Sequence, residues 1–288
     1  MNEDFVHAQN EIGKDEFKKR YRKIFNDKIE CLDYVETIFI NLPETCYCNC
    51  KFCIDKELKH NLINDNEKFL RTCERVFKEF PHVRNISIAG GSLPPDYFNR
   101  LIQLIMRYYK YNFIIWNTNG INIDKSYSDA IFPIDIVNLH CNSIDNVKNQ
   151  KIFNTTYNTM TIEYAKKLFK RRLWLRIPIL EDFNIDDYIS FGIPLYLNRL
   201  LPGTKETNKQ YDKIRKQLYV IGKERKRRNT YICGFYKKDT CVRLCVGDGL
   251  QKHIPNRKPT YLNVVNIHRS GIVSGSWYED DKFLYKEE

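Results

Sequence analysis

The stretch that decides the fold is Glu36–Leu42 (ETIFINL), followed almost at once by Thr45–Cys53 (TCYCNCKFC). The first segment is a short apolar run and predicts a buried β-strand. The second is a loop that holds four of the ten cysteines of the chain within eight residues. Because the chain shows no export signal, disulfides are disfavoured, and this crowding indicates a metal or catalytic role.

Beyond this loop, apolar strands alternate with helical segments. Strands are expected at residues 36–42, 85–89, 112–117, 134–140, 173–180 and 192–197. Helices are expected at residues 67–80, 96–109 and 161–170, with a further short helix capped by Asn184. About six strands separated by helices predict βαβ units and a parallel sheet with right-handed crossovers. The fold class is therefore α/β.

Two flanking segments differ in character from this core. Residues 10–30 read as a charged amphipathic helix, so residues 1–33 are expected to form an N-terminal helical segment. Residues 34–203 hold the alternating strands and helices. Residues 204–288 begin with a long basic helix, 205–229, and continue into a cysteine-containing tail with a hairpin around His268–Ser270.

Composition narrows the class of protein. The chain has 288 residues, 42% of them hydrophobic, and a formal net charge of +11. No apolar run approaches the roughly 20 residues that cross a bilayer, and the polar N-terminus lacks the apolar region of a secretory signal. We expect a soluble cytoplasmic protein with no membrane contact. The charge favours anionic partners: nucleic acid, nucleotides, or an acidic carrier or reductant.

Three cysteines of the loop, Cys46, Cys50 and Cys53, have the spacing x3 and x2. Three thiolates on one short loop can hold three irons of a [4Fe–4S] cluster and leave the fourth iron open. The preceding strand would place the cluster at the carboxyl end of the sheet, where α/β proteins carry their sites. The alternative is a zinc knuckle, which normally uses four ligands in paired spacing. Cys48 is expected to be a spectator.

Together these features resemble the radical S-adenosylmethionine (radical SAM) superfamily. Its motifs occur here in the right order over residues 36–200. They are Phe52 before the third cysteine, Gly90-Gly91-Ser92-Leu93-Pro94 in place of Gly-Gly-Glu-Pro, Thr118-Asn119-Gly120, His140, Cys141 and Asn142 after the fourth strand, and Arg176 on the fifth.

The resemblance implies a partial (β/α)6 TIM-like barrel with a small α+β C-terminal extension. It also implies that SAM binds the open iron and is cleaved to methionine and a 5′-deoxyadenosyl radical, which takes a hydrogen atom from a substrate. A low-potential donor of flavodoxin or ferredoxin type would supply the electron. The residues implied to bind the cofactor are Phe52, Gly90, Gly91, Ser92, Asn119, His140, Asn142 and Arg176.

Several of these residues also have simpler interpretations. Gly90-Gly91 can be an ordinary turn after a strand, and Asn119-Gly120 a turn that requires positive φ. Cys141 is either a hydrogen-atom donor or substrate contact at the mouth of the barrel, or a small buried residue. The basic run 223–228 is either a solvated helix end or a contact to RNA or nucleotide, although no nucleic-acid-binding motif supports the latter.

A second cysteine group, Cys233, Cys241 and Cys245, suggests an auxiliary iron–sulfur cluster, a zinc site or free thiols. The sequence thus predicts a radical SAM enzyme acting on a small anionic metabolite or nucleotide. The alternatives are a peptide- or RNA-modifying radical SAM enzyme with an auxiliary cluster and, outside enzymes, a zinc-binding nucleic-acid-binding protein.

Overall fold

The structure is a computed structural model, and it describes most of the chain between residues 35 and 286. The described residues are 35, 37–44, 46–50, 53, 65–110, 112–199, 203–221, 231–236, 240–245, 264–275 and 283–286. The helix predicted at 10–30 lies outside them, as do residues 222–229 of the predicted basic helix. None of the helices in these ranges combines the length and apolar character needed to span a membrane.

The core of the fold is a run of parallel strands joined by helices. The elements in chain order are β1 (Thr37–Leu42), α2 (Asn66–Glu79), β2 (Asn85–Gly90), α3 (Pro95–Tyr108), β3 (Phe113–Thr118), η3 (Lys125–Tyr127), α4 (Ser128–Ile131), β4 (Ile136–His140), α5 (Asn146–Phe153), α6 (Ile162–Phe169), η4 (Lys170–Arg172), β5 (Leu173–Pro178), α7 (Asp186–Ile189) and β6 (Leu195–Asn198). Strands β1 to β6 pair in sequence order, all parallel. The six predicted strands are therefore confirmed, in the arrangement of a partial TIM-like barrel.

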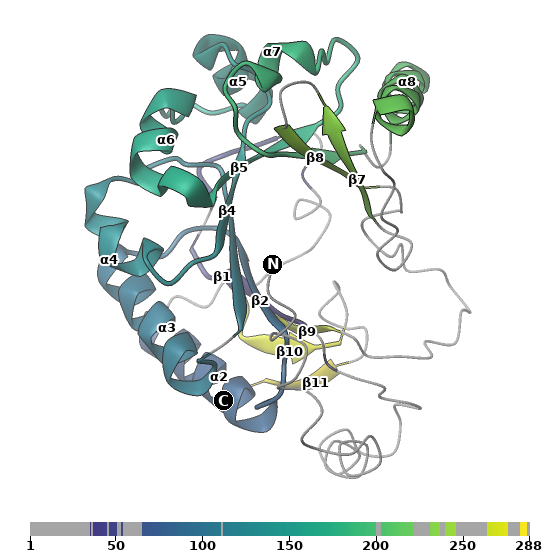
Figure 1. Cartoon of the computed structure of the whole chain (residues 1–288). Coiled ribbons are helices and arrows are strands. Elements are labelled where there is room, and N and C mark those ends of the chain that lie inside the picture. Colours follow the sequence, from purple (N-terminus) through teal and green to yellow (C-terminus); the bar gives the residue numbers. More distant parts are fainter. Residues whose placement is uncertain are drawn as a thin grey trace.

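The rest of the chain extends this sheet at both ends. It contains α8 (Lys205–Ile221), β7 (Tyr231–Tyr236), β8 (Thr240–Cys245), β9 (Val264–Ile267), β10 (Ile272–Ser274) and β11 (Phe283–Lys286). Strand β8 pairs parallel with β6 and carries β7, while β9 pairs parallel with β1 and carries β10 and β11. One eleven-stranded sheet results among the described residues, in the order β11-β10-β9-β1-β2-β3-β4-β5-β6-β8-β7 (Figure 1). The predicted hairpin around 268–270 is confirmed as β9 and β10.

The hydrophobic core lies between the strands and a row of helices along their outer side (Figure 1). Alternate residues of β1, Ile38, Ile40 and Leu42, are buried on this side. Trp116 of β3 packs there against Phe98 of α3, with ring centroids 4.6 Å apart, and against Phe169 of α6 at 6.2 Å. The opposite, inner side of the strands is thereby left for polar residues.

Two sequence expectations need correction. The last barrel strand was expected at 192–197 but begins at Leu195, because Gly192 has φ +62° and forms a turn. Helix α5 was not expected. It begins where Asp145 accepts a hydrogen bond from the Lys148 backbone N–H at 2.9 Å and ends where Asn154 adopts φ +49°.

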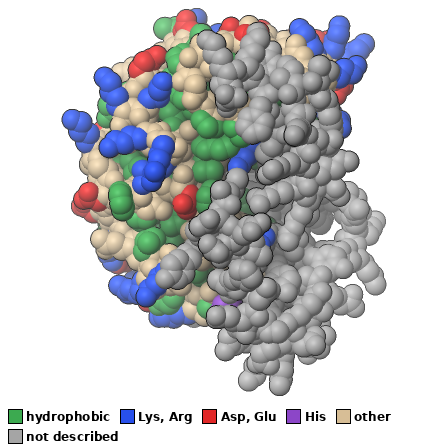
Figure 2. Space-filling view, in the orientation of Figure 1, with side chains coloured by type: hydrophobic (Ala, Val, Ile, Leu, Met, Phe, Trp, Pro, Cys, Tyr) green, Lys and Arg blue, Asp and Glu red, His purple; other side chains and the backbone are tan. Residues whose placement is uncertain are grey.

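Basic side chains occur at separate positions on the described part of the surface. On the face seen in Figure 2, Lys and Arg side chains project from many separate positions of the described part of the molecule, with acidic side chains among them. The described part of this face therefore shows no single basic stripe of the kind that follows a nucleic-acid backbone.

Candidate functional site

The cysteine loop begins directly after β1, at the carboxyl end of the parallel strands. The side-chain amide of Asn119, just past β3, points at its sulfurs: Nδ2 lies 3.5 Å from Sγ of Cys46 and 3.2 Å from Sγ of Cys48. The Cys53 N–H donates to the Cys50 carbonyl at 3.2 Å. Strand order thus brings Asn119 to the thiols, and its expected contact with the cofactor stays a prediction.

The thiols of this loop are crowded. Cys48 forms hydrogen bonds with Cys46 and Cys50, and these contacts, followed by burial, raise the pKa of the Cys48 thiol far above its usual range. Adjacent thiolates repel each other, and a bound metal reverses this because it carries the compensating charge. Within the described ranges no three His, Cys, Asp or Glu side chains already adopt a metal-binding geometry. The donor chemistry nevertheless fits an iron–sulfur cluster, since thiolates are its protein ligands.

The Gly90-Gly91-Ser92 stretch anchors the start of this loop. Glu44 and Ser92 exchange two backbone hydrogen bonds, of 3.2 and 3.4 Å, and the Ser92 hydroxyl donates to a Glu44 carboxylate oxygen at 2.8 Å. A Cβ on Gly91 would lie 1.5 Å from the Glu44 carbonyl oxygen, and Gly90 has φ +85°. Both glycines are therefore required by close backbone packing and by the turn, whatever ligand binds there.

The end of α5 holds the loop from the other side. The Asn49 N–H donates to the Phe153 carbonyl at 2.9 Å, and the Thr155 hydroxyl donates to the Tyr47 carbonyl at 2.8 Å. The Cys50 thiol also faces the Phe153 carbonyl, at 3.7 Å. These contacts were missed in the sequence because they use backbone carbonyls, which no residue pattern reveals.

A polar network lines the inner side of the strands below the loop. The side-chain oxygen Oδ1 of Asn117 accepts hydrogen bonds from Nδ2 of Asn138 at 3.0 Å and from Nη1 of Arg176 at 2.8 Å. The Asn117 amide donates in turn to Ser87 at 3.1 Å. Four strands, β2 to β5, are thus joined through one buried side chain, and Arg176 points inward as expected.

The three predicted residues at the end of β4, His140, Cys141 and Asn142, have different surroundings. His140 is opposite Arg176 in the ladder, and burial together with the Arg176 charge lowers its pKa to about 3, so the imidazole is neutral at pH 7. Cys141 follows on the other side of the strand, within the hydrophobic core, where its thiol donates to the Ser143 carbonyl at 3.2 Å. Burial raises the pKa of this thiol to about 12. The expected orientation toward the mouth is wrong for Cys141, because strand alternation turns it to the helices. This environment favours the packing interpretation, and the donor role stays a prediction.

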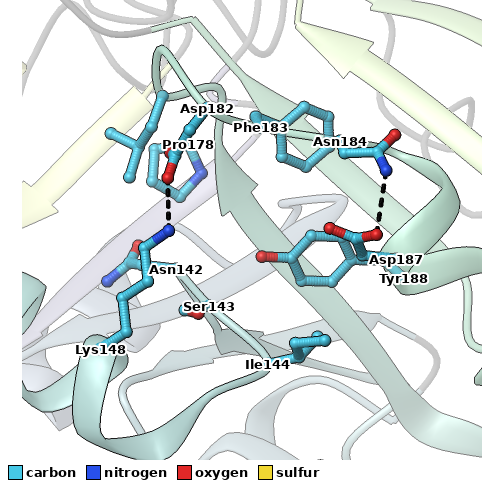
Figure 3. A pocket seen from close by; sticks show the side chains of 11 residues that line it. Asn142, Ser143, Ile144, Lys148, Pro178, Asp182, Phe183, Asn184, Asp187 and Tyr188 are labelled. Atoms are coloured by element: carbon cyan, nitrogen blue, oxygen red, sulfur yellow. Dashed lines mark hydrogen bonds and ion pairs between the residues drawn. The ribbon is translucent and has the colours of Figure 1, made fainter.

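Asn142 borders a pocket between the ends of β4 and β5 (Figure 3). Its side chain is buried, and neither its amide nitrogen nor its carbonyl oxygen has a partner among the described residues. Across the pocket, Lys148 pairs with Asp182, and Asn184 donates to Asp187 at 2.9 Å. A ligand with both donor and acceptor groups would satisfy Asn142.

The second cysteine group lies on the β7–β8 hairpin. Cys233 is opposite Arg243 in the ladder, and Cys245 is opposite Tyr231. Cys241 and Cys245 are four residues apart along β8, or roughly 13 Å at strand spacing. The second metal site stays a prediction, as does the role of Phe52, which lies outside the described residues.

Comparison with known proteins tests the predicted fold. No family model and no curated protein matches the chain. Among solved structures, Streptococcus suis SuiB is similar with a TM-score of 0.57 and 13% identity, over 90% of this chain and 64% of that one. SuiB bound to the precursor peptide SuiA is similar with a TM-score of 0.50 and 16% identity, over 70% of this chain and 50% of that one. The chain thus spans less than two thirds of the length of these proteins. The likeness confirms the predicted fold, a partial TIM-like barrel.

Proposed function

We propose that this chain, which has the fold of the radical SAM enzymes, is itself a radical SAM enzyme. The observation that carries the proposal is the cysteine loop at the carboxyl end of β1, with its crowded thiols contacted by Asn119. Cys46, Cys50 and Cys53 would hold a [4Fe–4S] cluster. When bound, the cluster and SAM supply the reductive cleavage that yields a 5′-deoxyadenosyl radical.

The protein's own residues would fix and shield this site. Glu44 and Ser92 tie the loop to β2, and Asn119 donates hydrogen bonds to sulfur, which disperses negative charge on thiolates. His140 can bind a ligand as an uncharged donor or acceptor. The contacts proposed for SAM remain those expected from the motifs: Phe52, Gly90, Gly91, Ser92, Asn119, His140, Asn142 and Arg176.

For the substrate we propose a small anionic metabolite or nucleotide. Support comes from the inner side of the barrel, where Arg176 and Arg243 lie at the same level of the sheet. The second candidate is a peptide, supported by the fold relative SuiB, whose structure holds a precursor peptide. A low-potential flavodoxin or ferredoxin is the proposed electron donor.

The test measures the cofactor and its chemistry together. The protein is reconstituted anaerobically with iron and sulfide, reduced with dithionite and mixed with SAM, and 5′-deoxyadenosine is measured by mass spectrometry. Substituting Cys46, Cys50 or Cys53 with Ala should abolish both the bound iron and the product.

The matched control is Cys48→Ala, in the same loop, which should retain both. Equal damage from Cys48→Ala would show that the ligand set is wrong. A colourless protein that binds zinc and leaves SAM intact would instead support the zinc-protein alternative.

A further inference from the structure

Four strands present one residue each to the same level of the inner wall. The ladders pair His140 with Arg176, Arg176 with Tyr196, and Tyr196 with Arg243. Residues directly opposite in paired strands point to the same face. Their neighbours Leu175, Leu195, Leu197, Val242 and Leu244 are fully buried on the helix side. The row from His140 to Arg243 therefore lies on the inner side of the sheet.

Both guanidinium groups in this row are stacked on aromatic rings. Arg243 lies over Trp174, with Cζ 4.2 Å from the ring centroid, and Arg176 lies over Tyr196 at 5.3 Å. Stacking orients the guanidinium plane and leaves its N–H edge available to a planar or tetrahedral anion. The two Cα positions are two strands apart, roughly 10 Å at sheet spacing.

No carboxylate of the described part of the chain matches the charge of either arginine. Among the described residues no Asp or Glu lies within ion-pair distance of Arg176 or Arg243. Nη1 of Arg176 donates a hydrogen bond to Asn117. Its Nε is buried and has no hydrogen-bond partner among the described residues. Buried donors are normally satisfied, so an unmatched donor in the same row as a second guanidinium indicates a missing acceptor.

We propose that Arg243, Trp174, Tyr196 and Arg176 form a binding site for an oxyanion, the carboxylate or phosphate group of the substrate. This inference rests on the proposed function and names the chemical class of its substrate. Arg176 is also among the residues expected to contact SAM, so the assignment depends on Arg243, which lies on β8 outside the six barrel strands.

The experiment titrates the reconstituted protein with inorganic phosphate and, separately, with succinate, with SAM present. Binding is followed by calorimetry and by the fluorescence of Trp174. The Trp174→Phe variant shows which part of the tryptophan fluorescence comes from this residue. The wild-type protein should bind at least one of the two anions at one site. Arg243→Gln should weaken this binding at least about tenfold, because a hydrogen-bonded charged group is removed. The anion affinity of Arg243→Lys should lie between those of the wild type and Arg243→Gln.

The matched control is Arg172→Gln. Arg172 also stacks on an aromatic ring, with Cζ 5.4 Å from the Phe132 centroid, but on the exposed surface. This variant should bind the anion as the wild type does. Phosphate binding alone indicates a phosphorylated substrate, and succinate binding alone a carboxylate.

Two results would overturn the proposal: unchanged affinity in Arg243→Gln with a native circular dichroism spectrum, or no binding of either anion by the wild type. Iron content and SAM affinity, measured on the same samples, separate this outcome from failure of the proposed function. If Arg243→Gln lost SAM binding, Arg243 would serve the cofactor, and the substrate assignment would fall while the proposed function stood. If no cluster formed, the proposed function would fail, and the titration of the same protein would still decide the anion site.

Discussion

Replacing Gly91 with alanine should loosen the cysteine loop and destabilise the fold. The added Cβ would lie 1.5 Å from the carbonyl oxygen of Glu44 and 2.7 Å from its carbonyl carbon. Both are backbone atoms, so no side-chain rotation relieves the clash, and the two backbone hydrogen bonds between Glu44 and Ser92 must break. Each such bond contributes about 1 kcal/mol, and overpacking costs about 1–3 kcal/mol. We expect Gly91→Ala to lower the free energy of unfolding by about 3–5 kcal/mol.

The matched control is Gly192→Ala. Gly192 has φ +62°, but a Cβ there meets no atom within 4 Å, so its cost is backbone strain alone, about 1–2 kcal/mol. Urea unfolding gives both free energies. A thiol reagent applied to the native proteins should react faster with the loop cysteines of Gly91→Ala only. If the two alanine variants lost equal stability and kept equal thiol reactivity, the anchoring role assigned to Gly91 would be wrong.

Three further predictions concern buried groups. Because burial and Arg176 lower the pKa of His140 from 6.5 to about 3, the unfolded chain binds a proton that the folded chain does not. The free energy of unfolding should therefore fall as the pH drops below 6.5, by at most about 1.4 kcal/mol per unit, and urea titrations of His140→Gln should lack this component. Tyr127 donates to the Leu93 carbonyl at 2.9 Å, so Tyr127→Phe should cost about 1–2 kcal/mol in the same assay, and no loss would contradict this role. Because burial raises the pKa of Cys141 to about 12, iodoacetamide at pH 8 should modify it about 1,000-fold more slowly in the native protein than in urea, as peptide mass mapping can show.

The sequence predicted the parallel core well because its strands are buried on the helix side and read as short apolar runs, as in β5 with LWLRIP. The joining of β9 to β1 was not predictable from local pattern. Their register, Thr37 with Val264, links residues more than 220 positions apart, and periodicity carries no information about such partners. Helix α5 was missed because its apolar residues are few and its start depends on one capping side chain, Asp145.

Within the candidate site, the cysteine spacing and the Asn119 motif were readable because the proposed chemistry requires particular residue types there. The contacts that hold the loop, at Glu44 and Phe153, are made by backbone atoms and leave no mark on composition. Arg243 was not predicted as a site residue, because the cysteines are the only conspicuous pattern in this part of the tail. The alternation in TCVRLC, with Val242 and Leu244 fully buried, was the signal that could have placed it on an inner face.

The pairing of β9 with β1 affects how the protein is made on the ribosome. Strand β1 and the cysteine loop emerge early, but the outer edge of β1 has no partner until residues 264–267 are synthesised, 222 positions after Leu42. At 5–20 residues per second that interval is about 10–45 s. During it, the strand that carries the cysteine loop exposes an unpaired edge, which is a template for aggregation. Slow decoding or truncation before residue 264 should therefore lower the yield of native protein more than the small size of the C-terminal strands suggests.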